Sequence, residues 1–239
     1  MTSFTPPDVS VALCENVPFE TASDTAMDNK AAFDAFDQTP EGANDPSRCK
    51  ALLAFPDGTI FWSSKMAIDA DGPAGGPGRL CGSQLDPDSG QNDTSFHFCD
   101  TDQGLPSEAV SFIVLPGGTF RTNTGLELGD VARVIYKDKI DAAICGDIGP
   151  SRKIGEGSIR LHEALHPPAP DPCSERQPDG SCKRILNDSI DEDVLFFVFP
   201  KSGFGQELTL SNLETLVNER AFTLYNKFRG VTCRRPIDI

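Results

Sequence analysis

The sequence predicts a mainly β fold with a few helices, which we interpret as a β-rich α+β protein built on a small six-stranded barrel. Three observations support this prediction. Short β-leaning runs alternate with Gly and Pro turns along the chain. Residues 144–165 have the pattern of a strand, a tight Asp-Gly corner and a short helix. Residues 193–200 form the most apolar run, and its position near the end of the chain is typical of a closing central strand.

The first regular elements lie between residues 51 and 72. Residues 52–55 and 59–62 flank the turn Pro56-Asp57-Gly58, and this pattern predicts a β-hairpin. A further strand is expected over residues 64–72, where Asp69 and Asp71 occupy alternate positions before a turn at Gly72. Upstream the chain is irregular, and downstream a long polar loop is expected before the next strand.

The middle of the chain predicts strands at residues 109–115, 131–136 and 140–145. The last of them leads into the corner Gly146-Asp147-Ile148-Gly149-Pro150. Beyond it, Ser158 is the expected N-cap of a short helix.

The C-terminal part predicts one strand and one long helix. Residues 193–200 are too few and too rich in β-branched and aromatic side chains for a helix, so we expect a central strand. Residues 210–228 have an amphipathic helical pattern. Because no repeat or boundary is visible, we expect a single domain over residues 1–239, with an irregular N-terminal segment (1–50) and a helical C-terminal extension (205–239).

The charge balance restricts the possible partners. The chain has 36 acidic against 21 basic residues and a formal net charge of −15. This balance argues against nucleic acid as a partner, because phosphates require a basic surface. A polycation would be attracted. No apolar run approaches the length of a membrane span, so no membrane partner is expected, and the chain is expected to be a monomer.

Eight cysteines at irregular spacing, without a Cys-x-x-Cys pair, indicate a disulfide-stapled exported protein. A disulfide between Cys173 and Cys182 would close a short polar loop. The first seven residues have neither a basic start nor an apolar core. We therefore expect a secreted, extracellular protein whose signal peptide is absent from this sequence.

One motif suggests metal chemistry. His162-Glu163-Ala164-Leu165-His166 matches the His-Glu-x-x-His pattern of zinc proteases, with Glu163 as general base. Against this, Pro167 ends the helix at once, and no pattern identifies a third ligand. We keep the zinc protease as an alternative and expect neither a metal nor another cofactor.

Two acidic residues are framed by glycines. Asp147 lies in the Gly-Asp-x-Gly-Pro corner, and Glu156 lies between Gly155 and Gly157 nine residues later. Glycine permits close approach of a ligand or another backbone, so we interpret both as exposed, positioned carboxylates. Such a pair suits general acid–base work.

Several segments in order carry a resemblance to a known family. They are residues 65–72, 91–95, 112–116, 146–150, 154–158 and 193–202. In this order they resemble the chitosanases of glycoside hydrolase family 75, fungal and bacterial. Ala70 and Lys201 depart from residues common in that family, where Cys and Gly are frequent.

The resemblance implies a secreted glycosidase that hydrolyses β-1,4-linked glucosamine within chitosan, with inversion at the anomeric carbon. It implies that Asp147 and Glu156 are the essential catalytic pair. We expect Asp69, Asp71, Gln91 and Thr94 to bind substrate. The barrel is similar to the double-psi barrel of expansins, lytic transglycosylases and some cellulases, an analogy at the level of fold.

The roles within the pair follow from their surroundings. Glu156 precedes a helix N-terminus, whose partial positive charge favours the anion, so we expect it to be the base. Asp147 follows an apolar strand, where burial favours the protonated form, so we expect it to be the acid. Asp69 or Asp71 remains an alternative base, and inversion requires a carboxyl separation of roughly 6.5–9.5 Å.

A second alternative is a non-catalytic, expansin-like barrel that binds polysaccharide. In that case the acids would hold a cationic polymer without cleaving it.

Overall fold

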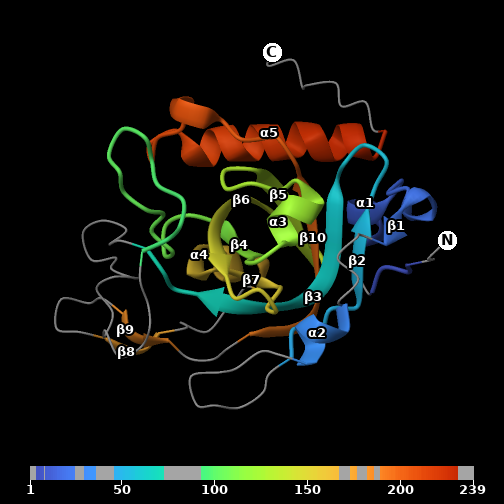
Figure 1. The fold of residues 1–239 in the computed structure, drawn as a ribbon, viewed down its shortest axis with the longest axis horizontal. Coiled ribbons are helices and arrows are strands. Elements are labelled where there is room, and N and C mark those ends of the chain that lie inside the picture. Colours follow the sequence, from blue (N-terminus) through green and yellow to red (C-terminus); the bar gives the residue numbers. More distant parts are fainter. Residues whose placement is uncertain are drawn as a thin grey trace.

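The fold is a closed six-stranded barrel of mixed strand direction (Figure 1). The computed structural model describes residues 4–7, 9–24, 30–35, 46–72, 93–166, 173–176, 182–185 and 189–230. The barrel strands are β3 (Ile60–Asp69), β4 (Phe112–Pro116), β5 (Val131–Tyr136), β6 (Lys139–Gly149), β7 (Glu156–Ser158) and β10 (Ile190–Phe199). They follow the order β3-β10-β5-β6-β4-β7, and a further pairing of β7 with β3 closes the ring.

Two of the pairings in the ring are parallel. These are β4 with β6 and β3 with β7, and the other four are antiparallel. Two short strands, β2 (Ala51–Ala54) and β1 (Ser23–Asp24), extend the sheet beyond β3. The predicted six-stranded barrel is therefore confirmed, whereas its double-psi character stays a prediction.

From Val194 to Phe199, strand β10 is apolar and buried on both faces. Leu195 and Phe197 belong to an outer cluster that also contains side chains of helix α5 (Leu213–Phe228). Phe196 and Val198 belong to a second cluster, which fills the barrel interior. Strictly alternating burial would have left one face polar, so a continuous apolar run is the pattern expected of a central strand.

The helices cover the barrel without contributing to its ring. Helix α5 runs along one side of it (Figure 1), and α4 (Ile159–Leu165) and α3 (Phe120–Thr124) add side chains to the interior cluster. The predicted N-cap of α4 is confirmed, because the Ser158 hydroxyl accepts a hydrogen bond from the backbone N–H of Leu161 at 3.2 Å. Two short helices, α1 (Val11–Cys14) and α2 (Lys30–Ala35), lie in the N-terminal segment.

A bulge at Gly146 redirects the end of β6. Opposite β4, Ile113 pairs with Cys145 and Val114 pairs with Asp147, so that Gly146 is the extra residue. A Cβ atom on Gly146 would lie 2.6 Å from Leu105 Cδ1 and 2.7 Å from the Cβ of Phe112. The bulge therefore requires glycine, and it sets the direction in which Asp147 leaves the strand.

The parallel pairing of β3 with β7 also depends on glycines. Gly155 has a φ of +82°, and its carbonyl accepts the backbone N–H of Ala67 at 2.9 Å. A Cβ atom there would lie 2.1 Å from the Lys65 carbonyl oxygen. Gly157 would likewise meet Leu161 at 2.9 Å. The two glycines that frame Glu156 thus let β7 lie against β3.

The four cysteines whose side chains the structure describes form no disulfide. Cys14, Cys49, Cys99 and Cys145 are free thiols. In the hairpin of β8 (Cys173–Arg176) and β9 (Cys182–Ile185), Arg176 pairs with Cys182 while Cys173 pairs with Ile185. This register does not set Cys173 opposite Cys182, so the predicted loop-closing disulfide is not confirmed.

Membrane insertion was not expected from the sequence. Over the described ranges, every helix is too short or too polar to cross a bilayer.

The glycine at position 155 gives a test of the barrel closure. Gly155→Ala is expected to lower the free energy of unfolding by about 1–3 kcal/mol more than Gly58→Ala, measured by urea denaturation. Gly58 is a matched control, because it also has a positive φ (+93°) but its added Cβ would contact no atom within 4 Å. Equal losses in both variants would show that close packing at Gly155 is not required.

Candidate active site

Four carboxyl groups gather where β3, β6 and β7 end or begin. Asp69 is the last residue of β3, and Asp71 follows two positions later. Asp147 lies near the end of β6, and Glu156 is the first residue of β7. In the parallel ladder Glu156 lies opposite Ala67, and Ser158 lies opposite Asp69. Glu156 and Asp69 are therefore diagonal neighbours on one face of the sheet.

Three of the four carboxyl groups form a tight cluster. Oxygen atoms of Asp69, Asp71 and Asp147 lie within 4.8 Å of one another. Asp69 and Asp147 are only 6% and 7% exposed. The expectation that Asp147 is an exposed carboxylate was therefore wrong, since the Gly146 bulge turns it into a nearly closed site.

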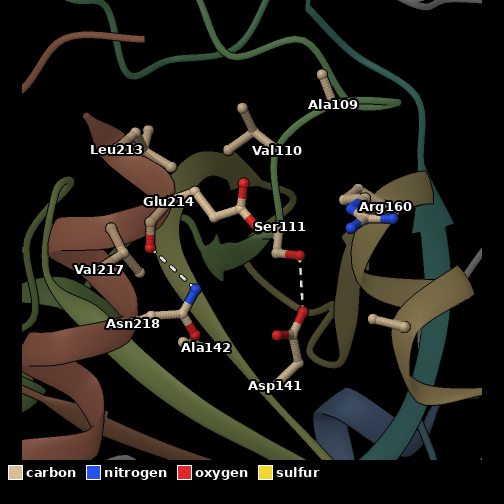
Figure 2. Close-up of a pocket in the computed structure, with 11 residues that line it drawn as sticks. Ala109, Val110, Ser111, Asp141, Ala142, Arg160, Leu213, Glu214, Val217 and Asn218 are labelled. Atoms are coloured by element: carbon tan, nitrogen blue, oxygen red, sulfur yellow. Dashed lines mark hydrogen bonds between the residues drawn. The ribbon is translucent and has the colours of Figure 1, made fainter. Parts of the chain in front are cut away.

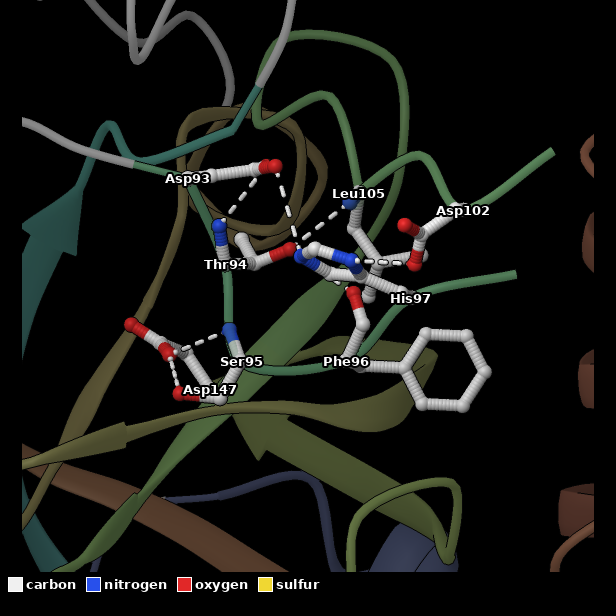
Figure 3. Close-up of polar contacts among 8 residues, drawn as sticks. All are labelled: Asp93, Thr94, Ser95, Phe96, His97, Asp102, Leu105 and Asp147. Carbon is white, nitrogen blue, oxygen red and sulfur yellow. Dashed lines mark hydrogen bonds and ion pairs between the residues drawn. The ribbon is translucent and has the colours of Figure 1, made fainter. Parts of the chain in front are cut away.

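Asp147 is held by Ser95, a residue of the chain between β3 and β4. Its Oδ1 accepts the Ser95 backbone N–H at 2.8 Å and the Ser95 hydroxyl at 2.5 Å (Figure 3). Two donors on one oxygen fix the orientation of the carboxylate. Both of these hydrogen bonds reach Oδ1 and neither reaches Oδ2.

Thr94 holds the loop around Ser95 in place through hydrogen bonds. Its side chain is buried, its hydroxyl donates to the Phe96 carbonyl at 3.1 Å, and it accepts the Leu105 N–H at 2.7 Å (Figure 3). The backbone N–H of Thr94 donates to Asp93 Oδ1 at 3.0 Å. These contacts anchor the chain on both sides of Ser95.

Glu156 is oriented by a cation. Lys153 Nζ donates to Glu156 Oε1 at 2.8 Å, and the two side chains are 21% and 14% exposed. The second oxygen, Oε2, lies close to the end of β6, since a Cβ on Gly149 would be 3.7 Å from it. Lys153, in the connection between β6 and β7, thus pairs with Glu156, the first residue of β7.

The surroundings of Asp69 disfavour its ionised form. Burial raises its pKa well above the usual aspartate range, and the neighbouring charges of Glu156, Asp71 and Asp147 raise it further. A hydrogen bond from the Asp71 N–H to Asp69 Oδ1 at 2.8 Å opposes this rise. Burial and like charge both disfavour a second ionised carboxylate here.

Glu156 is not among the three carboxyl groups whose oxygens lie within 4.8 Å of one another. Its Oε2 lies beside Gly149, which follows Asp147 by two residues on the same face of β6. The oxygens of the cluster are closer together than the roughly 6.5–9.5 Å between the acid and the base of an inverting glycosidase.

Five of the six expected site residues lie in the part of the chain that the structure describes. Asp147, Glu156, Asp69 and Asp71 come together, whereas Thr94 is buried behind the loop and joins the site through Ser95. Gln91 lies outside the described residues. The expectation that Asp69, Asp71, Gln91 and Thr94 bind substrate stays a prediction.

Three residues that position the site were not singled out from the sequence. Ser95 anchors Asp147, and Lys153 pairs with Glu156. The Ser107 hydroxyl donates to the Asp69 carbonyl and accepts the N–H of Ile159 at 3.0 Å. The pairing of Lys153 with Glu156 could have been predicted, because the two residues are three positions apart in the sequence. The contact between Ser107 and Asp69 could not, because 38 residues separate them in the sequence.

The His-Glu-x-x-His motif does not form a metal site within the described chain. His162 is fully buried, and the ring centroids of His162 and His166 lie 5.8 Å apart at 86°. Among the described residues, the one group of three possible ligands close enough together is Asp69, Asp71 and Asp147. Nothing in that group marks it as a metal site rather than a cluster that shares a proton.

A separate hollow lies between β6, α4 and α5 (Figure 2). Its polar lining includes Ser111, Asp141, Arg160, Glu214 and Asn218. The Ser111 hydroxyl donates to Asp141 Oδ2 at 2.8 Å. None of the four clustered carboxyl groups lines this hollow, so it is distinct from the carboxyl site.

Paired carboxyl groups on a small closed barrel are the type of site that glycoside hydrolases use. The sequence profile of the fungal chitosanases of glycosyl hydrolase group 75 matches residues 66–215. This range covers more than half of the chain and contains all four carboxyl groups. The chain therefore belongs to this glycoside hydrolase family, and the resemblance inferred from the sequence is confirmed. No curated protein matches the chain.

The loop that carries Ser95 contains a titratable contact. His97 Nδ1 lies 3.1 Å from Asp102 Oδ1, and His97 Nε2 lies 3.3 Å from Asp93 Oδ2 (Figure 3). The hydrogen bond with Asp102 is the largest cause of a raised His97 pKa.

Removal of the Asp102 charge should lower the His97 pKa. Asp102→Asn is expected to bring it back toward the ordinary histidine value, because the amide no longer stabilises the imidazolium ion. NMR titration of the imidazole protons measures the shift, and Asp100→Asn, another exposed aspartate, is the control. An unchanged His97 pKa in Asp102→Asn would contradict the contact.

Proposed function

We propose that the protein is an endo-acting chitosanase that cleaves β-1,4-linked glucosamine with inversion. The observation that carries the proposal is the arrangement of two oriented carboxyl groups within the family-matched region: Asp147 held by Ser95, and Glu156 held by Lys153. Inverting glycosidases need an acid and a base separated widely enough for a water molecule.

Inversion by this pair requires a carboxyl separation of roughly 6.5–9.5 Å. Glu156 suits it better than Asp69 or Asp71 does, because the oxygens of those two lie within 4.8 Å of Asp147 and Glu156 is outside that group.

We assign water activation to Asp147 and proton donation to Glu156, the reverse of the roles expected from the sequence. Both hydrogen bonds from Ser95 fall on Oδ1 of Asp147, which orients the carboxylate and leaves Oδ2 to accept a proton from water. Lys153 occupies Oε1 of Glu156, so Oε2, beside Gly149, is the oxygen that would carry the donated proton. The Lys153 ammonium group then stabilises the anion that Glu156 becomes once this proton has passed to the leaving oxygen.

The charge of the chain suits the proposed substrate. Chitosan is cationic, and a net charge of −15 would raise its local concentration at the protein surface. A polymer of this size is met outside the cell, which favours secretion. The four free thiols add no argument for secretion.

We propose that the catalytic unit is one domain acting as a monomer. Helix α5 contributes Leu213, Val217, Ala221 and Tyr225 to the same cluster as barrel strands. Phe19, from the N-terminal segment, belongs to that cluster too and lies 5.2 Å from the ring of Phe61. The flanking segments thus share the core of the barrel.

Variants of the pair test catalysis against mere binding of polysaccharide. Asp147→Asn and Glu156→Gln should each lower kcat on chitosan by about 10²–10⁴-fold, because each removes one proton-transfer group. Oligosaccharide release by chromatography and chitosan binding by sedimentation measure the two properties separately. The exposed Asp138→Asn is the matched control and should behave as the native protein.

An aryl chito-oligoside with a good leaving group separates the two roles in the same variants. Such a substrate needs little help from an acid, so Glu156→Gln should recover activity on it while Asp147→Asn should not. The opposite pattern would exchange the roles. Binding of chitosan without turnover by the native protein would instead support a non-catalytic barrel.

A further inference from the structure

The most buried carboxyl group of the site has no role in a two-carboxylate mechanism. Asp69 is 6% exposed, and three other carboxyl groups face it. Asp71 comes from the segment after β3, Asp147 from β6 and Glu156 from β7. Lys153 pairs with Glu156, which is not a member of the 4.8 Å cluster.

Full ionisation of this group of carboxyls is unfavourable. Like charges a few ångströms apart in a poorly solvated site cannot all be retained, so Asp69, Asp71 and Asp147 together keep a proton in addition to the one that Glu156 donates. The proton is expected on the carboxyl group with the least solvent and the most carboxylate neighbours. Asp69 meets both conditions, whereas Asp71 is more exposed and Asp147 already accepts two hydrogen bonds.

We propose that Asp69 is the neutral member of the cluster, a positioning residue that donates a hydrogen bond to the neighbouring carboxylates and thereby holds Asp147 as an anion. The arrangement of hydrogen bonds fits a carboxylic acid. The Oδ1 atom of Asp69 accepts the Asp71 N–H. We infer that the proton is on Oδ2, from which it would be donated to a carboxylate of the 4.8 Å cluster. The inference rests on the proposed function, because it names what supports the base.

The fold fixes Asp69 in this place from three directions. The Ser107 hydroxyl donates to its backbone carbonyl. The ladder with β7 sets it opposite Ser158. Its own side chain forms an Asx-type turn with the Asp71 N–H. These contacts hold the backbone of Asp69, so substitutions of the side chain probe its hydrogen-bonding role.

Asparagine reproduces the hydrogen bonds of a protonated aspartate. Its oxygen accepts the Asp71 N–H, and its amide donates in place of the hydroxyl group. We therefore expect Asp69→Asn to hydrolyse chitosan at least ten times faster than Asp69→Ala, with the difference in kcat rather than KM. A residue that binds substrate ammonium groups, or that acts as base, would lose its function in both variants.

A second measurement does not depend on activity. A raised folded-state pKa stabilises the protein below the unfolded-state value of about 4, and this stabilisation is lost as pH rises through the folded-state pKa. Urea unfolding at a series of pH values should show this decline in the native protein, and Asp69→Asn should lack it. Asp138→Asn is the control, because Lys139 lowers the pKa of that exposed group.

The two measurements separate failure of this inference from failure of the proposed function. If the native protein had no chitosanase activity, the proposed function would be wrong. The pH dependence of unfolding would still report the protonation of Asp69. Equal activity of Asp69→Asn and Asp69→Ala, or an unchanged decline in stability with pH in Asp69→Asn, would overturn the role assigned to Asp69.

Discussion

The three-residue parallel ladder between β3 and β7 is the interaction on which the site depends. It pairs Ala67 with Glu156, Ile68 with Gly157 and Asp69 with Ser158, and it closes the barrel. The same pairing brings Asp69, the last residue of β3, and Asp71, two residues later, close to Glu156, the first residue of β7. Close approach is possible because the residues beside Glu156 are glycines. Closure of the fold and assembly of the site are therefore one structural event.

The site concentrates negative charge in a place where solvent is scarce, and this has a cost in stability. Burial raises the pKa of Asp69, and three further carboxyl groups surround it. The protein offsets the repulsion with hydrogen bonds from Ser95 and Asp71 and with one ion pair to Lys153. A cationic polysaccharide would relieve it further, so the charge that destabilises the free protein favours the complex.

Local patterns were sufficient for much of the fold but only for part of the site. The hairpin turn at Gly58, the N-cap Ser158 and the doubly apolar strand β10 all follow from short-range rules, and the structure confirms them. The glycine frames identified Asp147 and Glu156 but suggested exposure, because burial of Asp147 depends on a bulge whose partner strand lies about thirty residues upstream. The proximity of Asp69 to Asp147, and the support from Ser95 and Ser107, arise from strand order, which no local pattern encodes.

The central claim is that water and the leaving oxygen are served by Asp147 and Glu156 from opposite sides of the scissile bond. The stereochemistry of hydrolysis tests it most directly, because a separation that admits water gives inversion. Proton NMR of a glucosamine oligomer during the first turnovers reports the anomer formed before mutarotation. The account predicts that the α-anomer appears first. Initial release of the β-anomer would contradict it, since retention requires a carboxylate close enough to form a covalent intermediate.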